Sequence, residues 1–328
     1  MKTPRLSAPR NGVHAAPLPC VSFRLLASFH SGTHAPAVKS APFEYARAGS
    51  LAEACELLAR HGDAAKVLAG GQSLVPMMAM RLLRPAWLID INEIPALKFI
   101  RVENDAARVG ACTRQATMER DDELAARVPL LRQALAWVGH VQTRNRGTIG
   151  GSLVHADPSA ELPLAAQALG ARLVLRSQKG ARTLDALEFF SGPMATAARS
   201  GECLEEVQWP IWPEKRTGSA FTEISVRHGD FAMVAAAAQV ALDADGCCTR
   251  AALGLGGVGG TPLAFPKIAA RLVGTRLEDA ALQEAGRAAA AESEPGGDLH
   301  ASPEYRRHLA RVLAVRALRE ARGRAEAA

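Results

Sequence analysis

QTRNRGTIGGSLVHADP, residues 142–158, is the most informative segment of this 328-residue chain. It packs glycines, small hydroxyl side chains and two arginines into a short span, and neither helix nor strand propensity alone would select it. A Gly-Gly turn lets backbone amides approach an anion that a β-carbon would keep away, and successive amides form a concave nest for phosphate oxygens. The pair Gly150-Gly151 is therefore a candidate phosphate-binding turn.

A second loop of the same kind lies upstream, in AGGQS at residues 69–73. It follows a short apolar strand predicted at 66–69, so it stands at the carboxyl end of a strand, where α/β folds place ligands. Two such loops would clasp a pyrophosphate from opposite sides, which suits a dinucleotide. The alternative is that each loop is only a tight turn.

The surrounding pattern predicts a mixed α+β chain. Ser50-Leu51-Ala52-Glu53 is a capping box that opens a helix ending near Gly62. Residues 74–82 are either a helix or an irregular apolar turn. Further strands are predicted at 87–91, 98–102, 108–112, 172–176, 203–209, 221–226, 233–242 and 251–255, and helices at 115–125, 129–138, 159–169, 281–291 and 303–321.

Changes of texture along the chain predict four parts. Residues 1–40 are an unpacked N-terminal extension, 41–95 and 96–215 are two subdomains that each carry one glycine loop, and 216–328 form a C-terminal α+β domain. Residues 1–43 hold no acidic side chain and are rich in Pro, Ala and His, which formally fits a transit peptide, although a plain extension is the simpler interpretation.

Composition argues against several classes of function. The net charge is +6, but residues 1–43 carry five basic residues, which leaves +1 on the rest, and only 5% of residues are aromatic, so a nucleic-acid groove is not expected. The longest apolar run, 231–242, is too short to span a bilayer. Six cysteines without a C-x-x-C spacing indicate reduced thiols rather than a zinc or iron-sulfur site.

Two further patterns have simple explanations. GLGGVG at 254–259 fits a dinucleotide fingerprint, but Gly260-Thr261-Pro262 follows where a helix should begin, so we interpret it as a turn. The arginines of the last helix are expected to form a solvated face, with partner docking as the alternative. They are Arg306, Arg307, Arg311, Arg316, Arg319 and Arg322.

Four separated strings resemble the flavin subunit of the molybdenum hydroxylase family, the family of xanthine dehydrogenase and carbon monoxide dehydrogenase. They are AGGQS at 69–73, RNRGTIGGSLVHADPSAELP at 144–163, RHGDFA at 227–232 and SPEYRRHLARVLAVRAL at 302–318. The resemblance covers residues 40–325 in family order. It implies a medium subunit that binds FAD, with a two-part FAD-binding domain followed by a smaller α+β domain that has a three-stranded antiparallel sheet and helices.

The resemblance also implies which residues contact FAD. Glu161 takes the place of an acidic residue that contacts FAD in the family, and Phe231 falls where relatives carry an aromatic side chain beside the isoalloxazine. Gln72 and Thr222 depart from the residues of some relatives. The full set implied by the resemblance is Lys66, Val67, Leu68, Ala69, Gly70, Gly71, Gln72, Ser73, Leu74, Thr148, Ile149, Gly150, Gly151, Ser152, Glu161, Leu204 and Phe231.

The implied role is electron transfer within a heterotrimer located in the cytoplasm. A molybdopterin-containing large subunit would oxidise the substrate, a small [2Fe-2S] subunit would relay electrons, and this subunit would pass them to NAD, a quinone or oxygen. No side chain need act as acid, base or nucleophile, and no metal ligands are expected. The alternative is a nucleotide-binding or assembly subunit that has the same fold and no flavin.

Overall fold

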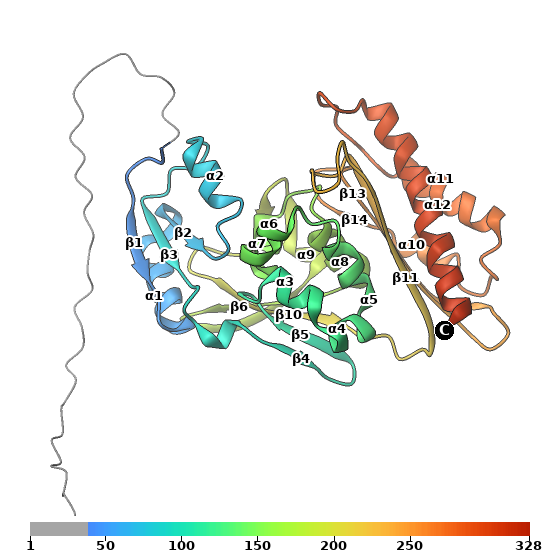
Figure 1. The fold of residues 1–328 in the computed structure, drawn as a ribbon, viewed down its shortest axis with the longest axis horizontal. Helices are drawn as coiled ribbons and strands as arrows, with labels where there is room; N and C mark the ends of the chain where they lie inside the picture. Colours follow the sequence, from blue (N-terminus) through green and yellow to red (C-terminus); the bar gives the residue numbers. More distant parts are fainter. Residues whose placement is uncertain (1–38) are drawn as a thin grey trace, which may run out of the picture.

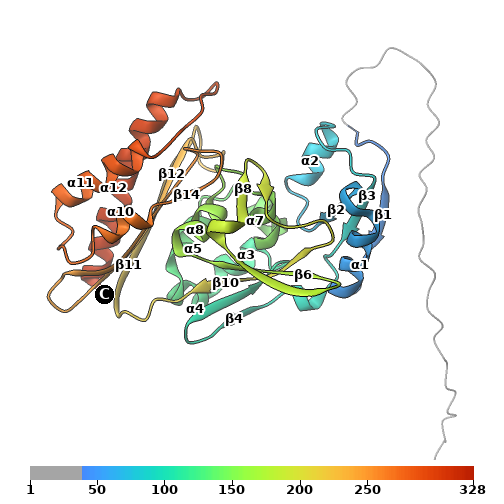
Figure 2. The same ribbon diagram turned by 180° about the vertical axis from the view of Figure 1, so that it is seen from behind.

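A computed structural model describes residues 39–328, so the expected N-terminal extension lies almost wholly outside the described residues. Three parts follow one another along the long axis of the molecule, in the order of the sequence (Figure 1; Figure 2, from behind). Each part has its own sheet, and the buried side chains fall into three corresponding clusters. The two glycine loops belong to the first and second parts.

The first part is a three-stranded parallel sheet with the order β1-β3-β2. Its strands are β1 (Glu44–Arg47), β2 (Ala65–Leu68) and β3 (Trp87–Asp90), and its helices are α1 (Leu51–His61) and α2 (Leu74–Ala79), with 3₁₀ turns at Gly62–Ala64 and Pro95–Leu97. The capping box at the start of α1 is confirmed in altered form. Ser50 Oγ accepts from Glu53 N at 3.1 Å, whereas the Glu53 carboxylate accepts from Gly49 N at 2.8 Å, one residue before the expected donor.

The second part is a five-stranded antiparallel sheet with the order β4-β5-β10-β6-β7. Its strands are β4 (Ile100–Val102), β5 (Ala106–Gly110), β6 (Arg172–Ser177), β7 (Gly180–Asp185) and β10 (Cys203–Pro210), with a small pair β8 (Phe190–Gly192) and β9 (Ala195–Thr196). Its helices are α3 (Gln115–Arg120), α4 (Asp122–Arg127), α5 (Pro129–Leu135), α6 (Val141–Arg146), α7 (Ile149–His155), α8 (Glu161–Leu169) and α9 (Ala186–Phe189).

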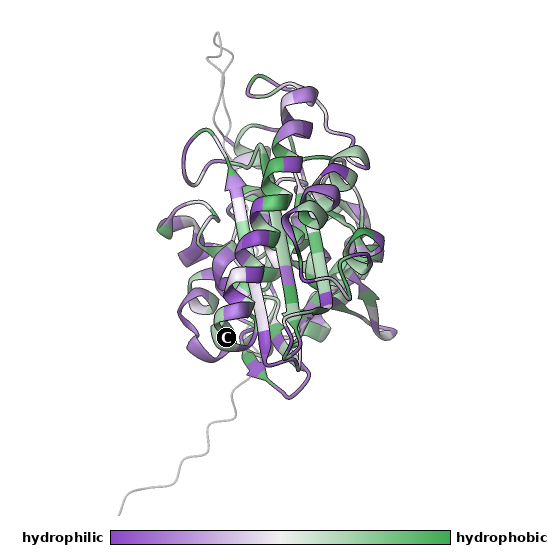
Figure 3. Ribbon diagram, turned by 90° about the vertical axis from the view of Figure 1, so that its right-hand side faces the viewer, coloured by the Kyte–Doolittle hydropathy of each residue, from purple (hydrophilic) through white to green (hydrophobic). Residues whose placement is uncertain are grey.

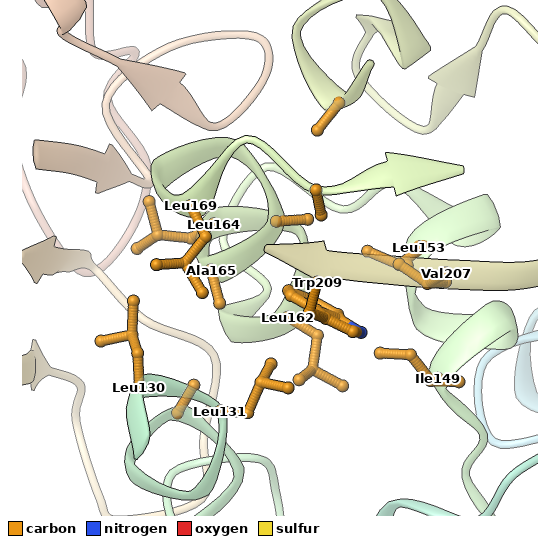
Figure 4. Close-up of a cluster of buried hydrophobic side chains, with 14 of the residues drawn as sticks. Leu130, Leu131, Ile149, Leu153, Leu162, Leu164, Ala165, Leu169, Val207 and Trp209 are labelled. Carbon is orange, nitrogen blue, oxygen red and sulfur yellow. The ribbon is translucent and has the colours of Figure 1, made fainter. Parts of the chain in front are cut away.

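The central core fixes the position of the second glycine loop. Ile149 and Leu153, both on α7, are fully buried and lie beside Val207 and Trp209 of β10 (Figure 4). Leu162, from the next helix, packs into the same cluster. Burying these side chains stabilises the fold by roughly 1.5–3 kcal/mol each, so α7 is held firmly on the sheet.

The third part is an antiparallel sheet covered by helices on one face. Its strands are β11 (Arg216–Ile224), β12 (Val234–Leu242), β13 (Cys248–Gly256) and β14 (Leu263–Ala264), in that order, and its helices are α10 (Pro266–Ala270), α11 (Asp279–Ala291) and α12 (Pro303–Ala327). Figure 3 shows α12 lying across the strands. Side chains alternate along β11: Ala220 packs in the C-terminal core, and Phe221 packs in the central core.

The α+β fold class is confirmed, and several local expectations need correction. The C-terminal sheet has four strands rather than three, because the two-residue strand β14 pairs with β13. Arg306 is not part of a solvated face: it is buried and donates to the Met233 and Gly257 carbonyls and to Asp298. Strands β1 and β7 and helices α6 and α7 were not predicted. Within the described residues, no helix is long and apolar enough to cross a membrane.

Candidate functional site

The two glycine loops lie side by side, although 79 positions separate their centres, Gly71 and Gly150, in the chain. A β-carbon built on Gly70 would stand 2.5 Å from the Arg146 carbonyl oxygen and 2.8 Å from Gly147 Cα, so only glycine permits this approach. A β-carbon on Gly151 would stand 4.0 Å from the β-carbon of Ala69. The first and second parts of the molecule therefore meet at these loops.

The first loop offers free backbone donors. In the part of the chain that the structure describes, the amides of residues 70–73 form no hydrogen bond, while Val75 N donates to Gly71 O at 3.1 Å. Gly71 has a φ of +73°, a left-handed conformation that favours glycine and turns the chain back on itself. Gln72 Nε2 donates to Gly70 O at 3.1 Å and steadies the turn. Four unpaired amides in one turn are suited to an anion.

The second loop is differently built, which corrects the expectation of two equivalent nests. The segment from Ile149 onward is helical, with Thr148 as its N-cap: Thr148 Oγ1 accepts from Gly151 N at 3.1 Å. Ile149 N and Gly150 N donate to carbonyls of the second sheet's edge, at 3.1 and 2.9 Å. The amides of residues 149–152 are thus already paired. The second loop therefore lies close to the first loop but offers no free backbone donors from residues 149–152.

Glu161 is a buried acid at the first position of α8. Burial raises the pKa of its carboxyl to about 7, a hydrogen bond to its own backbone amide opposes this, and the charge of Asp157 adds to it. Near neutral pH, a carboxyl with this pKa is present in both its protonated and its ionised form. A carboxyl in this state can either accept or donate a hydrogen bond, which is a useful property at a ligand site.

Sequence reasoning missed Glu223 on β11. This side chain is buried, and neither of its carboxyl oxygens has a hydrogen-bond partner in the described part of the chain. Burial, and then the charge of Glu161, raise the pKa of Glu223 to about 9, so Glu223 is neutral at pH 7. The two acids influence each other electrostatically although 62 residues separate them. The signal in the sequence was an acidic residue at an inward position of a buried strand.

The remaining expected site residues are distributed as follows. Lys66, Val67 and Leu68 lie on β2 and lead into the first loop, and Leu74 begins α2. Leu204 lies on β10 and is buried in the central core, where it offers a ligand no polar side-chain group. Phe231 is 71% exposed and sits in the loop between β11 and β12.

The loop that carries Phe231 is anchored to the second part. His228 stacks on Trp137 with ring centroids 5.0 Å apart, and Gly229, at a φ of +90°, packs against His140. The backbone of this loop is thereby fixed, while the Phe231 ring stays free on the surface. An exposed aromatic ring of this kind is available to stack on a planar ligand.

Residues 257–262 contain no helix, as expected for the glycine-rich turn that follows β13. Among residues 39–328, no group of three or more His, Cys, Asp or Glu side chains is arranged to hold a metal ion. The described cysteines are free thiols, and burial raises the pKa of Cys112 to about 11.

Comparison with known families accounts for nearly the whole described chain. Residues 41–212 match the family described as FAD binding domain in molybdopterin dehydrogenase, and residues 219–321 match the CO dehydrogenase flavoprotein C-terminal domain. The first match spans the two parts that carry the glycine loops. The second spans the sheet that carries Glu223 and the helices that cover it.

Individual relatives agree with these families. The chain is 39% identical to the 6-hydroxypseudooxynicotine dehydrogenase complex subunit alpha of Paenarthrobacter nicotinovorans, over 88% of this chain and 97% of that one. It is 37% identical to the carbon monoxide dehydrogenase medium chain of Afipia carboxidovorans, over 87% and 98%. A solved structure of reconstituted CO dehydrogenase from Oligotropha carboxidovorans superimposes with a TM-score of 0.85 and 36% identity, covering 87% and 99% of the two chains.

Proposed function

The chain belongs to the family of FAD-binding medium subunits of molybdenum hydroxylases, and from this premise we propose that it holds FAD between its two glycine loops and passes electrons to an external acceptor. The observation that carries the proposal is the contact of the loops: Gly70 packs against the Arg146–Gly147 peptide, and the amides of residues 70–73 form no hydrogen bond within the described chain. Backbone amides without a partner, next to the backbone of a second loop, can donate hydrogen bonds to the oxygens of a diphosphate.

The residues present fit FAD in distinct roles. The amides of Gly70, Gly71, Gln72 and Ser73 would bind the diphosphate, and the segment Thr148–Ser152 would close its other side. The exposed ring of Phe231 would contact the ring system of the flavin. Lys66, Val67, Leu68 and Leu204 keep the positions implied by family resemblance and are proposed contacts on that ground alone.

Glu161 and Glu223 would supply the acidic side of the site. Glu223 is neutral and Glu161 is partly neutral at pH 7, so each can donate a hydrogen bond to a carbonyl or ring nitrogen of a ligand without bringing a full negative charge next to it. A ligand group would also satisfy the two orphaned oxygens of Glu223, whose burial without a partner is otherwise costly.

Bound FAD would supply the redox chemistry, since a flavin can take up electrons one at a time and release them as a pair. The protein's own contribution is to bind and orient that group and to shield it from water. We propose that the electrons come from [2Fe-2S] clusters of a small partner subunit and, before them, from a molybdopterin-containing large subunit. The acceptor would be NAD, a quinone or oxygen. Location in the cytoplasm stays a prediction of the sequence.

The visible absorption spectrum of the purified full chain tests this proposal. A flavin spectrum with about one FAD per chain supports it. Colourless protein that does not take up added FAD would instead favour a flavin-less nucleotide-binding or assembly subunit. Co-purification with an iron-sulfur subunit and a much larger subunit would test the proposed partners, and substrate oxidation by this chain alone would contradict the division of labour.

A further inference from the structure

Two side chains outside the glycine loops connect one loop to the other. Asn92, just after β3, donates from Nδ2 to Ala69 O at 2.7 Å and accepts on Oδ1 from Arg114 Nη2 at 2.8 Å. Arg114, just after β5, also donates from Nη1 to the Arg146 carbonyl oxygen. This bridge therefore runs without a break from the first sheet to the corner between α6 and α7.

Both ends of the bridge lie at the glycine loops. The Ala69 carbonyl immediately precedes Gly70, and the Arg146 carbonyl is the atom that a β-carbon on Gly70 would meet at 2.5 Å. The bridge thus joins the two peptides that lie against each other where the loops meet. A change in this separation would move the free amides of residues 70–73 relative to the wall formed by Thr148–Ser152.

The first half of the bridge is held by a carboxylate. Asp90 Oδ1 accepts from Asn92 N at 2.8 Å and from Asn92 Nδ2 at 2.7 Å, and Asp90 Oδ2 accepts from the Tyr45 hydroxyl at 2.6 Å. Burial opposes ionisation of Asp90, but these hydrogen bonds outweigh it and hold its pKa below the ordinary value. The orientation of the Asn92 amide is therefore fixed, with its oxygen toward Arg114.

The second half depends on the geometry of a guanidinium. Arg114 reaches two acceptors that belong to different parts of the molecule, and the planar fork of an arginine can bond both at once, whereas a lysine ammonium is a point charge on a flexible stem. Both of these acceptors are uncharged oxygens. Among residues 39–328, Arg114 forms no ion pair with a carboxylate. Its role in the bridge is therefore to connect the two acceptor oxygens and not to neutralise a negative charge.

We propose that Asn92 and Arg114 are positioning residues for the FAD diphosphate: they set the spacing of the two glycine loops and touch neither loop's amides. This inference rests on the proposed function and deepens it, because it names residues that govern FAD affinity through the shape of the site. Their hydrogen bonds form one connected path, so loss of either member breaks the same bridge.

The test measures FAD affinity in flavin-stripped full chain, by quenching of flavin fluorescence, for Asn92→Ala, Arg114→Met, Arg114→Lys and the double variant Asn92→Ala/Arg114→Met. Each single variant is expected to bind FAD about 10- to 100-fold more weakly, the range for loss of hydrogen bonds to a charged group. The double variant should be no weaker than the weaker single one. Arg114→Lys should resemble Arg114→Met, since it keeps the charge and loses the fork.

Arg108→Met is the matched control. Arg108 lies on β5, six residues before Arg114, and pairs in bidentate fashion with Glu206 of β10 at 3.0 and 2.9 Å. The substitution Arg108→Met should lower the melting temperature of the chain and leave FAD affinity unchanged. The ³¹P NMR resonances of bound FAD give a readout that general destabilisation would not move: they should shift in Asn92→Ala and Arg114→Met and stay in place in Arg108→Met.

Three results would overturn the inference. The first is that FAD affinity and the ³¹P resonances are unchanged in the single variants. The second is that the losses of affinity add up in the double variant. The third is wild-type affinity in Arg114→Lys, which would mean that only the charge of Arg114 matters. Failure of the wild-type chain to bind FAD is a separate outcome, because it would contradict the proposed function itself. The two failures are therefore distinguishable.

Discussion

Gly150 and Gly151 are neighbours in the sequence but face different surroundings. A β-carbon on Gly150 would lie 2.7 Å from both the β-carbon and the carbonyl oxygen of Ala111, inside the packed contact between α7 and the second sheet. A β-carbon on Gly151 would lie 2.8 Å from Thr148 Oγ1, the oxygen that caps α7, and 4.0 Å from the Ala69 β-carbon in the first loop. Gly150 is therefore required by packing on the second sheet, and Gly151 lies where the two loops meet.

Gly151→Val is expected to give folded protein that lacks flavin. The added side chain would extend into the space between the loops, at the cost of the Thr148 cap, which is worth about 1 kcal/mol. Visible absorption and a thermal melt of the same sample measure both effects. Stoichiometric FAD in this variant would show that the diphosphate does not pass between the loops.

Gly150→Val serves as the contrasting substitution. It would overpack a closed contact and should cost about 1–3 kcal/mol or more of unfolding free energy, with FAD loss only as a consequence. Urea unfolding of the two variants should therefore rank Gly150→Val as the less stable one. The reverse order would mean that α7 does not pack on the second sheet as described.

Glu223 predicts a specific pH dependence of stability. Its pKa is raised from 4.5 to about 9 in the folded chain, so between these values the folded state keeps a proton that the unfolded state releases. Stability is therefore full below the ordinary pKa and falls as pH rises toward 9, by at most about 1.4 kcal/mol per pH unit for one group.

The variant Glu223→Gln removes this titration and should be more stable than the parent at pH 8, with a smaller difference at pH 5. Urea unfolding at the two pH values, with the same flavin content in both proteins, measures the difference. An equal gap at both pH values would mean that Glu223 is ionised throughout. Glu161 titrates in both proteins, so its contribution largely cancels.

At the scale of single elements, periodicity and caps predicted the long helices well. Ser302 caps α12 as expected, accepting from Tyr305 N at 3.3 Å, and Pro303 stands at its first position. Helix α7 could not be predicted from propensity, because Gly150 and Gly151 are poor helix formers. Its first two amides, those of Ile149 and Gly150, donate to the carbonyls of Thr113 and Ala111, far away in the sequence.

The arginines of α12 illustrate the same limit. Arg306 is 7% exposed, whereas its neighbour Arg307 is exposed. A sequence pattern cannot predict this difference in burial, because it depends on the loops that follow β11 and β13. Arg306 Nη1 reaches the Met233 carbonyl and, at 3.3 Å, that of Gly257, and Nη2 reaches Asp298 at 2.6 Å. The helix is therefore tied to the sheet at its first turn.

Arg306→Met should lower the stability of the chain by about 1.5–3 kcal/mol through loss of these charged hydrogen bonds, whereas Arg307→Met should change it by less than about 0.5 kcal/mol. Differential scanning calorimetry of the two variants gives the comparison. Equal effects of the two substitutions would mean that Arg306 is exposed to solvent, as the sequence pattern predicted.

At the scale of the whole molecule, the sequence predicted the α+β fold class. It could not predict how β11 divides its side chains between two cores, with Phe221 in one and Ala220 in the other, nor that the charge of Glu161 would raise the pKa of Glu223. Such long-range pairings depend on tertiary packing rather than on local pattern.

Because FAD would join the first two parts, it should stabilise the chain as a whole. At a free FAD concentration 100 times its Kd, the expected gain in unfolding free energy is about 2.7 kcal/mol. Thermal melts with and without FAD measure it, and Gly151→Val should show none of the gain. Equal gains in the variant and the parent would place FAD elsewhere on the chain.

A crystal structure of the chain with bound FAD is the most direct test of the central claim. We expect the diphosphate oxygens within hydrogen-bond distance of the backbone amides of Gly70–Ser73, with Thr148–Ser152 on their other side. A diphosphate bound away from the junction of these two segments would contradict the account.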